Sequence, residues 1–297
     1  MTNTPVILTH NLTKSYGELA AVRELNLSVE SNSITAFLGQ NGAGKSTTIK
    51  ILLGMVRPSS GEGSVLGKRI TNAEENRAMR QRVAYVAEDK PLYGYMTVEQ
   101  TMRFASSFYT DWQADSARRL LNEYKLPPQR KIKTLSKGMR TKLALLLAFA
   151  RRPELLILDE PSEGLDPVGI ENLLQILVAR AAEGVTIFFS SHQIAEVERV
   201  ADHVCILDNG RLLVDAPLDQ LRQCYRRIDL VFATAPPESE FRITGVERIQ
   251  TQGYQMSVFA SRNAEAVIER ARNLEAVSVE VAPLGLRDIF LETVKGN

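Results

Sequence analysis

The stretch GQNGAGKST, from Gly39 to Thr47, constrains the fold of this chain more than any other feature. It fits the pattern G-x-x-x-x-G-K-[ST], follows the apolar strand-like run Ile34–Gly39 and leads into a helical pattern, Ser46–Met55. Glycines suit such a loop because a Cβ would obstruct the backbone N–H groups that surround phosphate oxygens. Lys45 is expected to reach the β- and γ-phosphates, and the Ser46 hydroxyl is expected to bind Mg²⁺. The stretch therefore predicts an α/β fold of the P-loop NTPase type. The residues expected to contact the nucleotide here are Gly39, Asn41, Gly42, Ala43, Gly44, Lys45, Ser46 and Thr47.

Two further apolar runs predict buried strands of a parallel sheet. They are Leu155–Glu160 and Val185–Ser191, and a helix is expected between them over about Pro167–Ala182. Because the carboxyl ends of parallel strands meet at one edge, Asp159 and Glu160 should face the phosphate loop. Asp159 suits the Mg²⁺ shell, and Glu160 suits orienting and deprotonating the attacking water. The alternative, a solvated strand end with incidental acids, is disfavoured beside a complete phosphate loop.

The pattern of the chain changes after residue 217. A short helical segment, LDQLRQCYR, leads into IDLVFATAPPESE, where prolines and polar residues indicate a turn or loop. Strand-like segments, QMSVFAS and AVSVEVA, then alternate with helical ones, RNAEAVIERARNL and LRDIFLETV. The chain is therefore predicted to have two domains, residues 1–217 and a small C-terminal α+β domain over residues 218–297.

Composition limits the classes of function. The chain carries 36 Lys and Arg residues against 35 Asp and Glu, so its net charge offers no argument for nucleic acid, and none is expected as a partner. No stretch approaches the roughly 20 apolar residues that span a bilayer, and MTNTPVILTH lacks the pattern of a signal peptide. Cys205 and Cys224 have no CxxC spacing and no neighbouring His ladder. Two reduced thiols are therefore expected rather than a disulfide framework or a zinc site.

An ordered series of motifs between about Val6 and Leu221 resembles the ATP-binding subunits of ABC transporters. The series is YG at Tyr16, then GQNGAGKST, YVAED, LSKGM, LLILDEP, SEGLD and SSH, which ends at His192. The resemblance implies a RecA-like core with a helical subdomain at about residues 90–152, within a nucleotide-binding domain of residues 1–217. It also implies an enzyme that binds ATP and Mg²⁺, hydrolyses ATP and couples this reaction to transport.

The motif LSKGM resembles the family's LSGGQ turn, which in a head-to-tail dimer caps the γ-phosphate held by the other subunit. The resemblance implies that the Ser136 hydroxyl and the Gly138 N–H contact that phosphate in trans, at the start of an apolar helix. Lys137 stands where the family usually has Gly, and Met139 where it usually has Gln. Because Ser136 and Gly138 are retained, function is expected to survive. The dimer partner is a second copy or a homologous ATPase subunit.

Four other positions resemble family positions of known role. Tyr16 resembles the aromatic residue that stacks on adenine, although packing in an edge strand is an alternative. His192 resembles the switch histidine at the γ-phosphate, and Asp166 lies in the loop through which subunits sense each other. Glu88 replaces the usual Gln, and its carboxylate can still meet the metal. The residues expected to act in catalysis are Glu88, Glu160 and His192, and those expected to bind Mg²⁺ are Ser46, Glu88 and Asp159.

The segment after Glu88 is unusually aromatic. Phe104 and Phe108, spaced i and i+4, are expected in the core of the helical subdomain. Tyr93 and Tyr95 lie in a Gly-containing loop and are expected to be exposed. The family docks the cytoplasmic helices of its membrane subunit here, which makes the two tyrosines candidates for that groove.

The resemblance also implies the setting of the protein. It implies separate transmembrane permease subunits and a peripheral location at the cytoplasmic face of the cell membrane. The end LGLRDIFLETV resembles the tail of ATPases that serve bacterial ABC-2-type exporters of drugs, peptide antibiotics and lipids or cell-wall polymers, which favours export over import.

Two alternatives belong to other classes of protein. A soluble ABC ATPase of DNA repair or translation should show a coiled-coil insertion or tandem ATP-binding halves, and neither occurs in the sequence. A regulatory module with slow or no turnover should lack the base, whereas Glu160 and His192 are both present. For the C-terminal domain, a part in dimerisation or regulation and a passive spacer both remain open.

Overall fold

The computed structural model describes residues 5–295 and divides the chain into two compact units. The first unit is Met1–Asp215 and the second is Ala216–Asn297. The outer ends of the two predicted domains, residues 1–4 and 296–297, lie outside the described residues. The first unit contains two sheets and the second contains one, and each unit has its own hydrophobic core.

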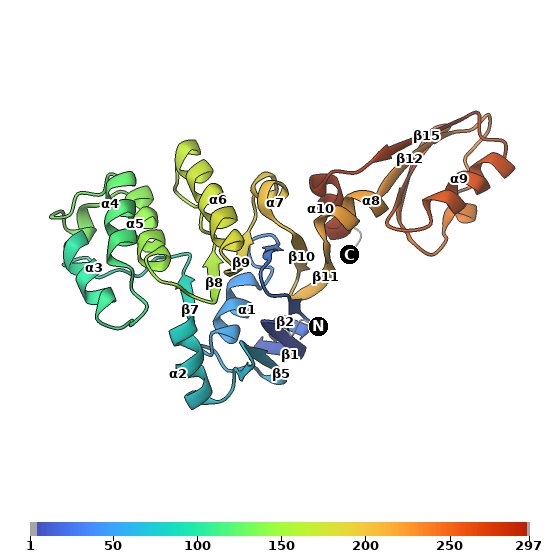
Figure 1. Ribbon diagram of the computed structural model, residues 1–297. Helices are drawn as coiled ribbons and strands as arrows, with labels where there is room; N and C mark the ends of the chain where they lie inside the picture. Colours follow the sequence, from blue (N-terminus) through green and yellow to red (C-terminus); the bar gives the residue numbers. More distant parts are fainter. Residues whose placement is uncertain (1–4, 296–297) are drawn as a thin grey trace. The chain divides into compact units, whose positions relative to one another are not determined.

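A six-stranded sheet runs through the first unit in the order β11-β10-β4-β9-β8-β7 (Figure 1). Neighbouring strands from β10 to β7 are parallel. β4, β8 and β9 are buried along their whole length, as their mainly apolar sequences require. The three predicted strands and the α/β fold class are therefore confirmed. The bounds are β4 Ile34–Leu38, β7 Val83–Val86, β8 Leu155–Asp159, β9 Thr186–Ser191, β10 His203–Asp208 and β11 Arg211–Pro217.

A second, antiparallel sheet in the same unit was not predicted from the sequence. It has the order β2-β1-β5-β6, and β3 pairs with β1. Helix α1 (Lys45–Leu52) contacts strands of both sheets, and its residues Ile49 and Ile51 belong to one core cluster with Ile7 and Phe37. The phosphate loop is thus anchored where the two sheets share a core. The bounds are β1 Ile7–Tyr16, β2 Leu19–Leu25, β3 Ser28–Val29, β5 Ser60–Val65 and β6 Lys68–Arg69.

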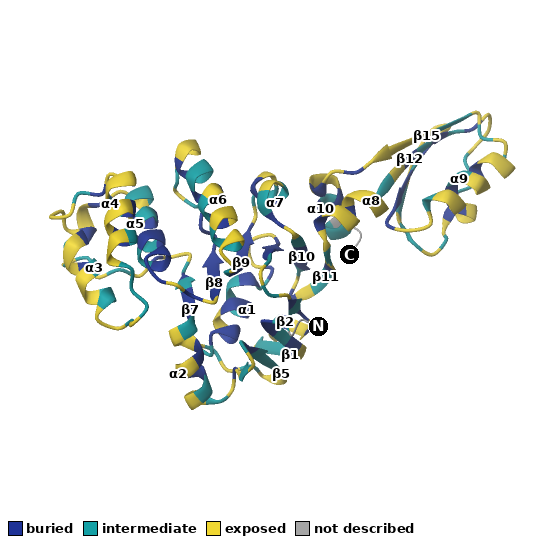
Figure 2. Cartoon of the chain, in the orientation of Figure 1, coloured by how far each residue is buried: buried dark blue, intermediate teal, exposed yellow. Residues whose placement is uncertain are grey.

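Four of the remaining helices of the first unit, α2, α3, α5 and α6, begin at residues whose side chains cap them. Thr97 and Gln100 form a capping box at α3, and Asp166 caps α6 directly before Pro167. α5 is buried or partly buried over most of its length, with Leu143 and Leu146 in the interior, and among its residues only Lys137 and Arg140 are exposed. Figure 2 colours each element by this burial. Among the described residues, no helix is long and apolar enough to cross a membrane. The bounds are α2 Ala73–Arg82, α3 Val98–Ser106, α4 Ala114–Glu123, α5 Lys137–Phe149, α6 Pro167–Ala182, α7 Ile194–Val200 and the 3₁₀ turn Ile132–Thr134.

The second unit is an antiparallel sheet in the order β13-β14-β12-β15 with helices, which agrees with the predicted α+β character. α9 packs Val267 and Ala271 against Ile228 and Val258 of the sheet. The predicted turn or loop in IDLVFATAPPESE lies at residues 232–237, between the end of β12 at Val231 and the 3₁₀ turn that begins at Glu238. The bounds are α8 Leu218–Cys224, β12 Arg226–Val231, β13 Val246–Gln252, β14 Gln255–Ala260, α9 Ala264–Asn273, β15 Ser278–Pro283, α10 Leu286–Lys295 and the 3₁₀ turn Glu238–Phe241.

Candidate nucleotide-binding and hydrolytic site

The phosphate loop joins β4 to α1 and depends on glycine at specific positions. Gly44 has a φ of 106°, and a Cβ there would lie 2.2 Å from the carbonyl oxygen of Ala21. Gly42 also has a positive φ, of 85°, but no atom lies within 4 Å of its would-be Cβ. α1 begins at Lys45, directly after Gly44. The left-handed backbone at Gly44 therefore places the first helical N–H groups at the end of the loop, where they suit an anion.

The Lys45 ammonium is buried and surrounded by acceptors. It donates to the carbonyl oxygens of Gly39, at 2.7 Å, and Gln40, at 3.2 Å. It also lies 3.2 Å from Glu160 Oε1, and both side chains are only 6% exposed. Glu160 Oε1 accepts no hydrogen bond among the described residues, so the Lys45 charge is its compensation. A triphosphate would compete with this carboxylate for the same ammonium.

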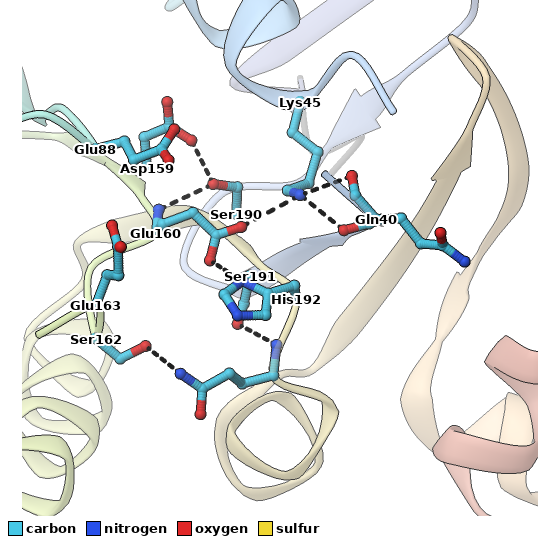
Figure 3. A network of polar contacts seen from close by, with 12 residues as sticks. Gln40, Lys45, Glu88, Asp159, Glu160, Ser162, Glu163, Ser190, Ser191 and His192 are labelled. Atoms are coloured by element: carbon cyan, nitrogen blue, oxygen red, sulfur yellow. Dashed lines mark hydrogen bonds and ion pairs between the residues drawn. The ribbon is translucent and has the colours of Figure 1, made fainter. Parts of the chain in front are cut away.

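Ser190 on β9 holds the two carboxylates at the end of β8. The register pairs Asp159 with Ser190, whose hydroxyl donates to Asp159 Oδ1 at 2.6 Å and accepts the Glu160 N–H at 3.1 Å (Figure 3). Glu160 has a φ of 47°, a left-handed conformation that is uncommon for a residue with a side chain. Ser190 is not among the predicted site residues, although it is the first residue of the SSH motif.

The Glu160 carboxylate also contacts His192. His192 Nδ1 lies 2.8 Å from Glu160 Oε2, and the His192 ring is half exposed (Figure 3). One buried carboxylate therefore lies between the Lys45 ammonium and the His192 imidazole. This arrangement fixes the orientation of Glu160 at the sheet edge that carries the phosphate loop, as a general base requires.

The three predicted metal ligands line one cavity of about 600 Å³. Ser46 Oγ lies 3.5 Å from Glu88 Oε2, at the limit of a hydrogen bond, and Asp159 lies on the same wall. Lys90 donates its ammonium hydrogen to the Glu88 carbonyl oxygen at 2.8 Å. Burial lowers the pKa of Lys90. A hydroxyl and two carboxylates are hard oxygen donors of the kind that Mg²⁺ prefers, so the donor set fits this ion.

The LSKGM turn packs against the SEGLD loop of the same chain. Ser136 caps α5 by accepting the Met139 N–H at 3.2 Å, and neither Ser136 nor Gly138 lines the cavity just described. Lys137 Nζ forms an ion pair with Glu163, and this hydrogen bond lowers the pKa of the Glu163 carboxyl group. Lys137, which stands where the family usually has Gly, thus has an ion-pair partner within the chain.

Backbone contacts support the same packing. A Cβ on Gly138 would lie 2.6 Å from the Gly164 carbonyl oxygen, and the Thr141 hydroxyl donates to the Glu163 carbonyl at 3.0 Å. Gly138 is therefore required for this close approach, whether or not its N–H binds phosphate.

Helix α7 holds the other side of the SEGLD loop through residues that the sequence analysis missed. Gln193 donates to Ser162 Oγ at 3.5 Å, and Glu196 is buried with Oε1 unpartnered among the described side chains. Burial raises the pKa of Glu196, while a hydrogen bond with Ser162 opposes this shift. Asp166 ends the loop by accepting the Gly169 N–H at 2.6 Å. The position of Glu196, four residues after His192 in the sequence, does not indicate that its side chain is buried.

Tyr16 lies at the end of β1 and is 51% exposed. The Lys14 ammonium lies 4.9 Å from its ring centroid. The ring is thus open to solvent on part of its surface, as stacking on an adenine base requires.

Four exposed aromatic residues form a patch on the helical subdomain. Tyr93 packs against Tyr95 and Phe104, with centroid distances of 5.8 and 5.7 Å, and Phe104 packs against Phe108 at 4.9 Å. The prediction that Phe104 and Phe108 are core residues was wrong, since they are 40% and 57% exposed. Their helical spacing placed them on one face but did not show whether that face is buried. We call these four residues the aromatic patch.

Comparisons with known proteins show the family to which the chain belongs. A family model described as ABC transporter matches residues 22–163. The bacitracin transport ATP-binding protein of Bacillus licheniformis is 35% identical over 225 residues, which cover 75% of this chain and 73% of that protein. The protein of the same description from Enterococcus faecalis is 30% identical over 303 residues, which cover 98% of this chain and 97% of that protein.

A solved structure described as the ATP binding subunit of an ABC transporter has the same fold. Its TM-score is 0.67 at 34% identity, and the match covers 73% of this chain and 92% of the other. The phosphate loop with Lys45 and the strand end with Glu160 fall within the residues that the family model matches. From this agreement of sequence, geometry and comparison, the chain belongs to the ABC transporter family as one of its ATP-binding subunits.

Proposed function

We propose that this subunit hydrolyses ATP at the edge of the six-stranded sheet and thereby powers an exporter built with separate membrane subunits. The observation that carries the proposal is the buried Glu160 carboxylate, held between Lys45 and His192 beside the phosphate loop. Relatives named for transport favour this function over a soluble ABC ATPase.

In the proposed reaction each residue has a distinct part. The loop N–H groups and Lys45 bind the β- and γ-phosphates, and Glu160 accepts a proton from the attacking water while His192 fixes its orientation. Ser190 supports both carboxylates through its two hydrogen bonds. Tyr16 supplies a surface for the adenine. Mg²⁺, when bound by Ser46, Asp159 and Glu88, would neutralise charge on the phosphates.

Glu88 is expected to set the Mg²⁺ requirement. Its carboxylate carries a charge that the usual Gln lacks, and it lies near Ser46 in the shared cavity. Glu88→Gln should raise the Mg²⁺ concentration for half-maximal turnover by roughly fivefold, since loss of about 1 kcal/mol of charge attraction corresponds to that factor. Phosphate release measured across a Mg²⁺ titration tests this. Glu74→Gln, which removes an exposed carboxylate of α2 that does not line the cavity, should leave the titration unchanged. An unaltered titration in Glu88→Gln would show that Glu88 does not meet the metal.

The subunit is proposed to work as a head-to-tail dimer, with itself or with a homologous subunit. Ser136 and Gly138 lie at the start of α5, outside the cavity that Ser46, Glu88 and Asp159 line. The turn of each subunit is therefore proposed to contact the phosphate bound by the other subunit. The free N–H groups and dipole of α5 suit the γ-phosphate there.

The membrane partner is proposed to dock on the aromatic patch, at the cytoplasmic face of the membrane. Exposed aromatic residues are typical anchors of protein interfaces. The relatives named for bacitracin transport make a peptide antibiotic the first cargo to test.

Co-purification from the native host tests the partner. Tagged Glu160→Gln protein, isolated in mild detergent with ATP and Mg²⁺, should bring with it a polytopic membrane protein identified by mass spectrometry. Adding Tyr93→Ala and Tyr95→Ala should reduce that recovery by roughly tenfold or more, because interface anchors contribute about 2 kcal/mol or more, without abolishing ATP binding. Tyr254→Ala, which removes an exposed tyrosine of the second unit, serves as the matched control. Recovery of soluble partners or nucleic acid alone would favour the soluble ABC class.

A further inference from the structure

Three side chains of different chemistry converge on neighbouring strands β10 and β11, apart from the hydrolytic residues. His203 and Cys205 lie two positions apart on β10, and Asp215 lies on β11. His203 Nε2 is 2.5 Å from Asp215 Oδ1, and Cys205 Sγ is 3.4 Å from the same oxygen. One ligand atom from each residue lies within 4.8 Å of the others. One nitrogen, one sulfur and one oxygen are therefore close enough together to be ligands of a single ion.

The environment is closed on the sulfur side and open on the other. Cys205 is fully buried, whereas the side chains of His203 and Asp215 are 27% and 32% exposed. Burial, followed by the charge of Asp215, raises the pKa of the Cys205 thiol well above its ordinary value. The Cys205 thiol donates a hydrogen bond to Asp215. A divalent ion entering past His203 and Asp215 would displace the thiol proton to solvent and compensate the charge of the resulting thiolate.

We propose that His203, Cys205 and Asp215 bind a zinc ion, with water as the fourth ligand. The donor set selects the metal, because thiolate and imidazole suit Zn²⁺ and disfavour Mg²⁺ and Ca²⁺. In a tetrahedral site with bonds of about 2.0–2.3 Å, the ligand atoms lie about 3.3–3.7 Å apart. The separation of Cys205 Sγ from Asp215 Oδ1 is already 3.4 Å, and binding requires His203 Nε2 to move away from Asp215 Oδ1. The absence of a CxxC spacing led to the expectation of reduced thiols and no zinc site. That argument considers only pairs of cysteines. Here the other two ligands are His203 on the same strand and Asp215 on the next strand.

Bound zinc would join β10 to β11 close to the phosphate loop. Leu207, two residues after Cys205, has its carbonyl oxygen 2.6 Å from a would-be Cβ of Gly39. The same leucine side chain lies 3.5 Å from a would-be Cβ of Gly44. The ion would therefore stabilise the strand against which the loop packs and would raise the melting temperature of the first unit. This proposal does not depend on the membrane partner or on turnover.

The test uses tag-free, chelator-treated full chain without nucleotide, in excess Mg²⁺ so that the phosphate site does not take up the probe. Titration with Co²⁺ should give one equivalent of binding with a thiolate charge-transfer band, and Zn²⁺ should displace it. Cys205→Ser should abolish the band, and His203→Gln should weaken binding by about 100-fold or more, at least the loss caused by outer-shell changes at such sites. Cys224→Ser, which removes the exposed cysteine of α8, should bind like the unaltered chain.

His203→Gln also covers the case in which Cys205→Ser disturbs the core, because His203 is partly exposed and its variant can be checked for folding by ATP binding. Zn²⁺ should raise the melting temperature of the unaltered chain and not that of His203→Gln. Co²⁺ binding without a thiolate band, a band lost in Cys224→Ser, or no binding at all would overturn the proposal.

Discussion

Glu160→Gln is expected to lower ATP turnover by about 10²–10⁴-fold while ATP still binds, the range typical of losing a positioned general base. The amide keeps the size of the side chain and can still hydrogen-bond to His192. It cannot accept the proton of the attacking water, and it no longer carries the charge opposite Lys45. Single-turnover phosphate release and a separate ATP-binding titration distinguish the chemical step from affinity.

A surface carboxylate provides the control for this variant. Glu154 forms an exposed pair with Arg82 in the same unit, so Glu154→Gln should leave turnover near that of the unaltered chain. If Glu160→Gln retained turnover within a few-fold, another group would have to act as the base, and the proposed part of Glu160 would be wrong.

Gly44→Ala is expected to cause the second large effect, on both stability and nucleotide binding. The new methyl group would meet the Ala21 carbonyl 2.2 Å away, and the φ of 106° is unfavourable for alanine. Backbone strain and overpacking together should cost about 2–5 kcal/mol. ATP affinity should fall as well, because α1 begins at the next residue and its N–H groups would be displaced. Denaturant unfolding and an ATP-binding titration measure the two effects.

Gly42→Ala is the matched control, since it shares the positive φ but has no atom within 4 Å of the new methyl group. The difference in unfolding free energy between the two variants therefore isolates the clash with Ala21. Equal stability of the two variants would show that this clash is relieved at little cost.

The main features of the fold were predictable because they rest on strong local signals. Glycines at fixed positions between a buried strand and a helix predicted the phosphate loop. The common edge of parallel strands predicted that Asp159 and Glu160 would face it. The antiparallel sheet was missed because strands such as β1 and β2 mix polar and apolar residues without clear alternation.

The finer features of the site depend on contacts between distant segments. Ser190 reaches Asp159 only through the pairing of β8 with β9, and Lys137 meets Glu163 only because α5 approaches the SEGLD loop. Nothing in the local sequence specifies either approach. The exposure of Phe104 and Phe108 is a third case. Their spacing predicts that they lie on the same face of a helix, but it does not show whether another element covers that face.

The packing of the LSKGM turn on the SEGLD loop has a consequence for cooperativity. Lys137, Gly138 and Thr141 all contact residues 163–164, which follow Glu160 by only a few positions. In the proposed dimer, the turn that senses the nucleotide of the other subunit is thus mechanically joined to the base that serves this subunit's own nucleotide. A shift at one phosphate should therefore be transmitted to the opposite base, and the two sites should hydrolyse ATP as a coupled pair, with a sigmoidal dependence of rate on ATP concentration.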